Sequence, residues 1–250
     1  MLLRDALGLG QEKVVSFVGG GGKTTAMYRL AAELGEKGAS IVVTTTTQID
    51  MTDAKDVGCT VITQDIKELC SKVKEKLRNY PIVAVGYDIT QEGKIKGVPP
   101  KWVGVLAELA DYVVVEADGA KGKPFKAPAE HEPVIPDSTE IVIAVVGIEI
   151  VGLELNGENV HRPERIRAIS GLSPGEIITP DIITKVVLHF LGIVKGTLPG
   201  TRILLLINKV EDEDKLAAAR EIGRLALNGG IERVIIAQLK IDPNVMELMQ

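Results

Sequence analysis

Cysteine is scarce in this sequence, with only Cys59 and Cys70 among 250 residues. They have neither CxxC spacing nor the neighbouring cysteines or histidines of a closed zinc site, and disulfide-rich secreted domains use many more cysteines. Long hydrophobic runs are also missing, since the longest, 141–148, is too short to span a bilayer. The first residues lack the apolar core of a signal peptide. We therefore expect a cytoplasmic protein with free thiols and no membrane partner.

Aromatic residues and long basic runs are the next absences. Aromatic residues make up 3% of the chain and hydrophobic residues 45%, so the core must be mainly aliphatic. Runs of valine, isoleucine and leucine favour a parallel sheet that is buried on both faces. The net charge is −5 and no long stretch of lysine and arginine occurs, so nucleic acid is not an expected partner.

The most informative stretch that is present is 14–25, with the sequence VVSFVGGGGKTT. An apolar run typical of a buried strand leads into consecutive glycines, and apolar residues at helical spacing follow. Glycine turns sharply without strain, so backbone N–H groups can converge, and the start of a helix adds its positive dipole end. The stretch predicts a loop that binds the phosphates of ATP or GTP, through Gly19, Gly20, Gly21, Gly22, Lys23, Thr24 and Thr25.

Two side chains of this loop have expected roles. Lys23 would neutralise the β- and γ-phosphates and so act in catalysis, and the Thr24 hydroxyl would be a ligand of Mg²⁺. The strict pattern G-x-x-x-x-G-K-[ST] has its first glycine where this chain has Phe17. The competing interpretation is a glycine turn that binds nothing, which requires strand, glycines, lysine and helix to coincide by chance.

A run of threonines, 44–47, ends the next predicted strand. Open α/β sheets bind ligands at the carboxyl ends of their strands, so the hydroxyls of Thr45 and Thr46 are candidates for contact with metal, water or phosphate. The alternative is that threonine is present only because it favours strands.

A third apolar stretch, 111–117, carries a carboxylate at its end. In phosphate-loop proteins such a strand delivers an acid to magnesium or to the attacking water, so we expect Glu116 to bind Mg²⁺ and Asp118 to orient the nucleophile. The alternative is a solvated carboxylate. The loop that follows carries three lysines, which either contact an anionic substrate or are ordinary surface residues. They are Lys121, Lys123 and Lys126.

Arg162 precedes Pro163, a residue typical of the first turn of a helix. Arg162 is a candidate catalytic residue that would clamp a phosphate or carboxylate or act as an arginine finger, and the alternative is a surface ion pair with a nearby glutamate. His131, between two glutamates, is either an acid–base or metal-binding group or a satisfied loop residue. His189 lies among apolar residues, and core packing is its expected role.

The segment 208–211 reads Asn-Lys-Val-Glu and follows another predicted strand. It is similar to the NKxD element of GTPases, with glutamate in place of aspartate. In that element the acid accepts hydrogen bonds from guanine N1–H and N2–H₂. Asn208, Lys209 and Glu211 are therefore candidates for contact with the nucleotide base, with a modest preference for GTP over ATP. A chance Asn-Lys pair at a strand end is the alternative.

Predicted strands alternate with predicted helices throughout the chain. The simplest fold is α/β: one P-loop NTPase-like domain over residues 1–250, with a doubly wound, mostly parallel sheet and helices on both faces. The segment 87–99 is expected to be a small hairpin insertion. We also expect an extended segment at 148–155 with Gly152 as its break, and a last strand at 233–237. Residues that follow this last strand, among them Lys240, are further candidates for the lining of the base pocket.

Five segments occur in the same order as the signature segments of YqeC-type proteins, which the sequence resembles over most of its length. They are FVGGGGKTT, VVTTTT, VVVEADGAKGKPFKAP with EHEPVIP, VHRPE with ISGL, and INKVE. YqeC-type proteins are accessory factors linked to selenium-dependent molybdenum hydroxylases. The resemblance implies a P-loop fold and a role in maturing such a hydroxylase, with the apo-enzyme or its cofactor intermediate as a partner.

The chain is more distantly similar to the class of P-loop proteins that contains metallochaperone GTPases, dethiobiotin synthetase and MinD-type ATPases. The maturation GTPases also carry a strand-ending glutamate, which supports Glu116 as the acid linked to the metal. MinD-type proteins use a lysine early in this loop to reach across a dimer interface, and this chain has Val18 at that place. A homodimer is therefore one alternative, but it would not form through that lysine.

Three functions remain open at this point. The first is an NTPase or phosphoryl-transfer enzyme that uses Mg²⁺. The second is a nucleotide-gated binding protein with negligible turnover, in which nucleotide orders the loop after Glu116. The third is a small-molecule kinase or ligase that resembles dethiobiotin synthetase.

Overall fold

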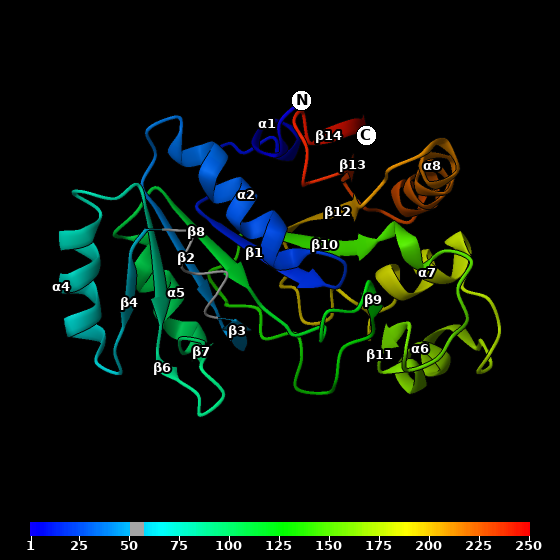
Figure 1. Ribbon diagram of the computed structural model, residues 1–250, viewed down its shortest axis with the longest axis horizontal. Coiled ribbons are helices and arrows are strands. Elements are labelled where there is room, and N and C mark those ends of the chain that lie inside the picture. The colour runs from blue at the N-terminus through cyan, green and yellow to red at the C-terminus, as the bar shows by residue number, and fades with distance from the viewer. Residues whose placement is uncertain (51–57) are drawn as a thin grey trace.

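The computed structural model describes residues 1–50 and 58–250, and its centre is a nine-stranded sheet (Figure 1). The strand order is β14-β13-β12-β10-β1-β8-β2-β5-β4, and neighbouring strands are parallel except β13 and β14. The predicted α/β class with a mostly parallel sheet is confirmed. The strands are β1 (Val14–Gly19), β2 (Ile41–Thr45), β4 (Thr60–Ile62), β5 (Ile82–Gly86), β8 (Tyr112–Glu116), β10 (Ile141–Gly147), β12 (Arg202–Asn208), β13 (Arg233–Ala237) and β14 (Val245–Met249).

Helices cover both faces of the sheet because successive side chains of a buried strand point to opposite faces. Along β12, Leu204 and Leu206 pack with α1 and α2, whereas Leu205 and Ile207 pack with α7 and α8. Helices α4 and α5 pack on this second face over β2, β5 and β8. None of the helices in the described ranges is long and apolar enough to cross a bilayer. The helices are α1 (Leu3–Leu7), α2 (Lys23–Gly35), α4 (Ile66–Lys76), α5 (Pro100–Ala107), α6 (Pro163–Ser170), α7 (Pro180–Leu188) and α8 (Glu213–Asn228).

The predicted hairpin insertion is confirmed and is part of a small antiparallel sheet with the order β3-β7-β6. Its strands are β3 (Gln48–Asp50), β6 (Asp88–Ile89) and β7 (Lys94–Lys96). The N–H groups of Gly97 and Val98 donate to the carbonyls of Thr47 and Thr45, at 2.8 and 2.9 Å. These bonds fasten the hairpin to the carboxyl end of β2.

Two expectations for the second half of the chain need correction. The start of the segment 148–155 is not extended, because β10 leads directly into a 3₁₀ helix, η1 (Ile148–Ile150), which Val151 closes by donating to the Ile148 carbonyl at 3.0 Å. This turn buries Ile148 and Ile150. The part after Gly152 is extended as expected, and Glu154 pairs antiparallel with Ile177. The strand at 233–237 is not the last one, since β14 returns antiparallel along its edge.

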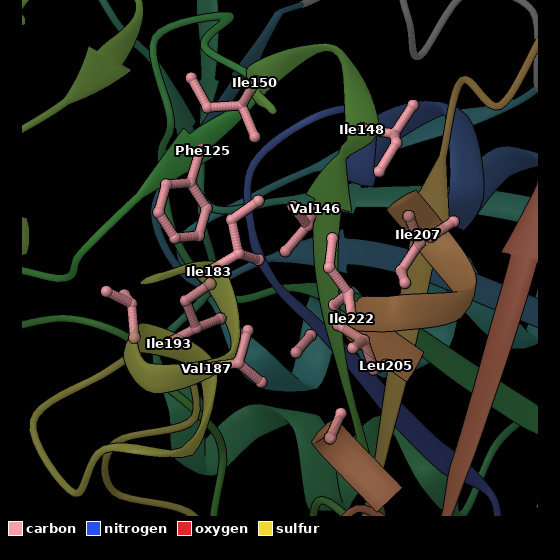
Figure 2. Packing of buried hydrophobic residues seen from close by; sticks show 14 of the residues in the cluster. Phe125, Val146, Ile148, Ile150, Ile183, Val187, Ile193, Leu205, Ile207 and Ile222 are labelled. Atoms are coloured by element: carbon pink, nitrogen blue, oxygen red, sulfur yellow. The ribbon is translucent and has the colours of Figure 1, made fainter. Parts of the chain in front are cut away.

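The loop between β8 and β10 is anchored beside the first strand by Phe125. Phe125 lies in β9 (Phe125–Lys126), which pairs in parallel with β11 (Val160–His161). Its ring is fully buried in the cluster that contains Ile183, Val187 and Ile193 (Figure 2). The residues that precede Phe125 are therefore held close to the glycine loop.

Candidate functional site

A cleft of about 960 Å³ opens at the carboxyl ends of the central strands. The glycine loop, the ends of β2 and β8, the loop that follows β8, and the hairpin sheet all contribute to its walls. The lining residues expected from the sequence are Gly21, Gly22, Lys23, Thr24, Thr25, Thr46, Glu116, Lys121, Lys123, His131 and Lys209.

Three N–H groups of the glycine loop already have acceptors inside the protein. The Gly19 N–H donates to the carboxylate of Asp118, with 3.1 Å to each oxygen. The Gly20 N–H donates to the Val145 carbonyl at 2.9 Å, and the Gly21 N–H donates to the Lys123 carbonyl at 3.0 Å. These glycines shape the loop and tie it to its neighbours, so a ligand would have to take its hydrogen bonds elsewhere.

The absence of side chains in this loop permits close backbone packing. A Cβ at Gly20 would lie 2.6 Å from the Lys123 carbonyl oxygen, and a Cβ at Gly21 would overlap the backbone nitrogen of Gly147. Gly21 also has a φ of +86°, which residues with a side chain rarely adopt. Both the path of the chain and the proximity of 123–125 therefore require glycine here.

The start of α2 supplies the N–H groups that remain available. Ala26 makes the first intrahelical bond, to the Gly22 carbonyl at 2.9 Å, so the N–H groups of 22–25 precede the ladder and have no acceptor within the helix. Gly22, the N-cap residue, has no side chain to cap them. This end of the helix faces the cleft and carries the positive end of the helix dipole, which is the arrangement that binds phosphate in many proteins.

Lys23 lies at this helix start and is almost fully buried. Its Nζ donates to the Gly19 carbonyl at 2.7 Å and lies 3.3 Å from Asp118 and 3.7 Å from Glu116. Burial acts to lower the pKa of Lys23, but the charges of Asp118 and Glu116 outweigh it, and the pKa lies above its usual value. Lys23 is therefore a permanent positive charge beside the free N–H groups.

Thr24 and Glu116 place two side-chain oxygens, which are suitable as metal ligands, close together in the same cleft. The Thr24 hydroxyl donates to Glu116 at 2.6 Å. Mg²⁺ takes oxygen ligands, keeps several waters, and is commonly held by one or two carboxylates together with the phosphates of a nucleotide. The described residues contain no cluster of three or more histidines, cysteines or carboxylates arranged for a metal, and a nucleotide-bound Mg²⁺ does not need one. Thr24 and Glu116 fit this ion.

A chain of alternating charges connects Lys23 with Arg162. Asp118 is fully buried and also pairs with Lys126 at 3.0 Å. Lys126 pairs with Glu132 at 2.7 Å, and Glu132 accepts two hydrogen bonds from Arg162, at 2.5 and 3.3 Å. The interpretation of Lys126 as a mobile or surface lysine is wrong, because its side chain is 0% exposed. Asp118 and Arg162, which the sequence indicated as catalytic candidates, form ion pairs with Lys126 and Glu132 and do not line the cleft.

Glu132 shows the electrostatic effect of this chain of charges. Burial acts to raise the pKa of Glu132, but hydrogen bonds from Arg162 and Lys126 together with their charges lower it to about 2. The carboxylate is therefore ionised throughout the physiological range. It compensates the charge of Lys126, which would be costly to bury alone.

The hydroxyls of the threonine run are used within the protein. Thr45 is fully buried and donates to the Glu116 carbonyl at 2.8 Å, and Thr46 donates to the Val134 carbonyl at 2.7 Å. Thr46 lines the cleft, whereas Thr45 does not. Thr45 thus positions the strand end that carries Glu116, and contact with metal or phosphate stays a prediction for Thr46.

The segment 208–211 divides into two parts. Asn208 is buried, and its amide donates to the Gly21 carbonyl at 2.9 Å and accepts from the Leu239 N–H at 3.1 Å, so it braces the glycine loop. Lys209 lines the cleft and forms an ion pair with Glu149. Glu211 is exposed, pairs with Lys215 at 3.1 Å and does not line the cleft. Base recognition by this segment stays a prediction that depends most directly on Lys209.

The histidines occupy different environments. His131 is exposed and lines the cleft. His161 lies in β11, where burial together with the nearby charges of Arg162 and Lys126 lowers its pKa. His189 is half-buried at the end of α7 rather than part of the core, and its Nδ1 accepts from the Leu191 N–H at 3.1 Å. Its apolar neighbour Phe190 is exposed, which explains why the core prediction was wrong.

The sequence patterns missed two basic residues of the cleft, Lys94 and Lys96, which belong to the hairpin. Lys240, which follows β13 and was expected near the base pocket, also lines the cleft. Alternation was an available signal for the hairpin, because Ile95 is buried and the lysines on either side must share the opposite face.

Comparison with known proteins places the chain in a family. A family model described as YqeC protein matches residues 15–164, which include the glycine loop, Glu116, Glu132 and Arg162. The chain belongs to the YqeC family. An uncharacterized YqeC protein of Escherichia coli (strain K12) is 30% identical over 247 residues, which covers 95% of this chain and 93% of that protein. The family model covers the residues that line the cleft except Lys209 and Lys240.

Proposed function

We propose that this YqeC protein binds a nucleoside triphosphate together with Mg²⁺ and hydrolyses it. The observation that supports this most directly is the start of α2. Its N–H groups have no helical acceptor and face a cleft beside the buried charge of Lys23 and the Thr24–Glu116 pair. Charge neutralisation and positioning are the main requirements of phosphoryl transfer, and these groups meet both.

Each group has an assigned task in this proposal. The N–H groups of 22–25 hold the β-phosphate, and Lys23 leaves the Gly19 carbonyl to neutralise the β- and γ-oxygens. Thr24 and Glu116 hold Mg²⁺, which when bound offsets the charge of the phosphate oxygens. Asp118 keeps the glycine loop in place through the Gly19 N–H, and it orients the nucleophile only if the loop rearranges.

The nucleotide base is proposed to lie toward β12. The carboxyl end of β12 carries Asn208 and Lys209, and Asn208 is in contact with Gly21 of the loop. GTP and ATP both remain substrates to test, with GTP favoured by the similarity of 208–211 to the NKxD element. Because both ends of the Asn208 amide are occupied, we expect Lys209, which lines the cleft, to account for most of any selectivity, and Glu211 to contribute only if it moves toward the cleft.

A second function is supported by the chain of charges. When phosphate draws Lys23 away from Asp118, the electrostatic interaction between Asp118 and Lys126 changes. Lys126 also donates a hydrogen bond to the Gly119 carbonyl at 2.6 Å, so this change reaches the loop that contains Gly119. Nucleotide would then act as a switch for the loop 119–126, with little need for turnover. The role in maturing a selenium-dependent molybdenum hydroxylase is proposed from the family resemblance, and the apo-enzyme would be the partner of this loop.

Lys23→Ala tests the proposal. In wild-type protein we expect saturable binding of GTP or ATP with Mg²⁺ and slow steady-state hydrolysis, and in Lys23→Ala we expect hydrolysis to fall by at least about a hundredfold. Lys37→Ala, an exposed lysine near the other end of α2, is the control and should behave as wild type. Binding without turnover would favour the switch, and hydrolysis that survives in Lys23→Ala would remove the assignment of this site.

A further inference from the structure

The cleft is far more basic than the protein as a whole. The net charge of the chain is −5, yet seven of the residues that line the cleft are lysines and two are carboxylates. Two of these lysines are paired with carboxylates, Lys23 with Glu116 and Asp118 and Lys209 with Glu149, and Glu132 pairs with Lys126 and Arg162. The lysines of the lining still outnumber its carboxylates, so they produce a positive field that attracts anions.

Part of this basic lining lies on the side of the cleft away from the proposed base site. Lys94 and Lys96 belong to the hairpin sheet, which is fastened to the ends of β2 and β5 (Figure 1). In the order β12-β10-β1-β8-β2-β5, these two strands lie on the opposite side of β1 from β12. With strands spaced about 4.8 Å apart, β2 and β5 lie about 10 to 14 Å from β1. A nucleotide that extends from α2 toward β12 would leave the hairpin lysines without a ligand.

The hairpin lysines are held in place. Lys96 Nζ lies 5.6 Å from the centre of the Tyr87 ring, and Tyr87 in turn packs on Trp102 with ring centroids 5.6 Å apart. Ile95 anchors β7 in the core between the two lysines. Among the side chains that the structure describes, Lys94 pairs with Glu92 at 3.7 Å, and this exposed ion pair is too weak to neutralise it. The ammonium groups are thus presented on a fixed strand.

Lys121 completes the arrangement from the loop that follows β8. It lines the same cleft, is exposed, and has a φ of +49°. The volume of about 960 Å³ lies at the upper end of the range of roughly 300–1,000 Å³ in which ligand pockets commonly fall, which leaves room beside a nucleotide.

We propose that Lys94, Lys96 and Lys121 form a second anion site, which binds the phosphate group of a small phosphorylated substrate beside the nucleotide. The proposal rests on the proposed function in one respect, since it assumes that the nucleotide extends toward β12. Lysine is a common point-charge partner of phosphate, and charges on two separate elements would fix the position of a dianionic group better than one could. The Thr24–Glu116 pair lies between the two sites because β8 lies between β1 and β2.

The experiment uses the full-length protein saturated with a non-hydrolysable ATP or GTP analogue and Mg²⁺, with inorganic phosphate as the probe. Phosphate binding is followed by phosphorus NMR or calorimetry at physiological ionic strength. We expect a saturable site in wild type that Lys94→Gln/Lys96→Gln weakens at least about tenfold, and that Lys121→Gln weakens independently. Analogue affinity should change less than about twofold in each variant, since these lysines do not contact the nucleotide.

Lys67→Gln/Lys74→Gln is the matched control, because it removes two exposed lysines of α4 that lie outside the cleft. Phosphate affinity that is equal in wild type and Lys94→Gln/Lys96→Gln would overturn the second site while leaving the nucleotide site intact. Failure of the analogue to bind, with lysine-dependent phosphate binding retained, would overturn the proposed function instead. Tighter lysine-dependent binding of a single-stranded oligonucleotide than of phosphate would overturn the assignment to a small molecule.

Discussion

At the scale of single residues, the buried charges of this protein are stable only as a connected set. Removing an ion from water costs several kcal/mol even after the protein relaxes, so each buried charge needs partners of opposite sign. Lys126 is the clearest case, because it is fully buried and pairs with both Asp118 and Glu132. Loss of one partner leaves a buried charge that is only partly compensated.

Glu132→Gln is therefore expected to lower the free energy of unfolding at neutral pH, by about 3–5 kcal/mol. The pH dependence has a definite sign. The pKa of Glu132 is about 2 in the folded protein and near 4.5 otherwise, so its contribution is complete above pH 4.5 and is lost as the pH falls toward 2. Urea unfolding at a series of pH values should show a steeper loss in this window for wild type than for Glu132→Gln.

Glu130→Gln is the control for this measurement. Glu130 is exposed, and its ion pair with Arg165 at 3.5 Å lies at the surface, so its removal should change the free energy of unfolding by less than about 1 kcal/mol. Identical slopes below pH 4.5 in wild type and Glu132→Gln would contradict the role of Glu132 in compensating Lys126.

At the scale of elements, the turn from β1 to α2 requires glycine for two separate reasons. The backbone there has a positive φ, and a Cβ atom would collide with neighbouring backbone atoms. Gly21 and Gly38 both have a φ of +86°, but they differ in their surroundings. A Cβ at Gly21 would overlap the backbone of Gly147, whereas nothing lies within 4 Å of a Cβ at Gly38. The two positions allow the cost of strain to be separated from the cost of crowding.

Gly38→Ala is expected to lower the free energy of unfolding by about 1–2 kcal/mol, the cost of placing a side chain in the left-handed region. Gly21→Ala should cost clearly more, because the backbone of β10 must also move, and it should weaken nucleotide binding. Urea unfolding and nucleotide titration measure both effects. Equal losses of stability in the two variants would show that the close approach of Gly21 to β10 is unimportant.

At the scale of the whole molecule, the two ends of the chain meet at one buried carboxylate. Glu33 of α2 accepts from the Arg4 N–H at 2.9 Å and from Arg29 at 2.8 Å, and it also accepts from the side chain of Asn244. The Val245 N–H donates to the Met1 carbonyl at 3.1 Å, and both ends of the chain lie beside α1 and β14 in Figure 1. Glu33 therefore links α1, α2 and the segment before β14.

Glu33→Gln should lower the free energy of unfolding by about 2–4 kcal/mol, because a neutral amide cannot accept all three hydrogen bonds. Glu36→Gln, an exposed change one turn further along α2, should stay within about 0.5 kcal/mol of wild type. Thermal and urea unfolding measure the difference. Nucleotide affinity should be unchanged in both, since Glu33 lies away from the cleft; a large loss of affinity in Glu33→Gln would contradict this separation.

Local patterns in the sequence predicted much of the framework. The aliphatic runs of β1, β8 and β10, the glycine loop and the hairpin have signals that depend on neighbouring residues only, and the structure places them as expected. The start of the segment 148–155 was misjudged because apolar residues such as Ile148 and Ile150 can be buried by a short 3₁₀ turn as well as by an extended segment. The strand β14 escaped prediction because pairing along the edge of β13 depends on a partner rather than on its own residues.

The α/β class, the family and the location of the glycine loop were predictable from the residues alone, because each has signals in short stretches of the chain. The N–H groups of that loop that are left for a ligand were not predictable in this way, since Asp118, Val145 and Lys123, which are distant in the sequence, accept from those of Gly19, Gly20 and Gly21. Lys126, expected to be an ordinary loop lysine, lies buried at the centre of an ion network in the fold. The fold also places the hairpin lysines in the lining of the cleft. Parallel strands bring distant segments together at their carboxyl ends, and burial and charge pairing there depend on the whole fold.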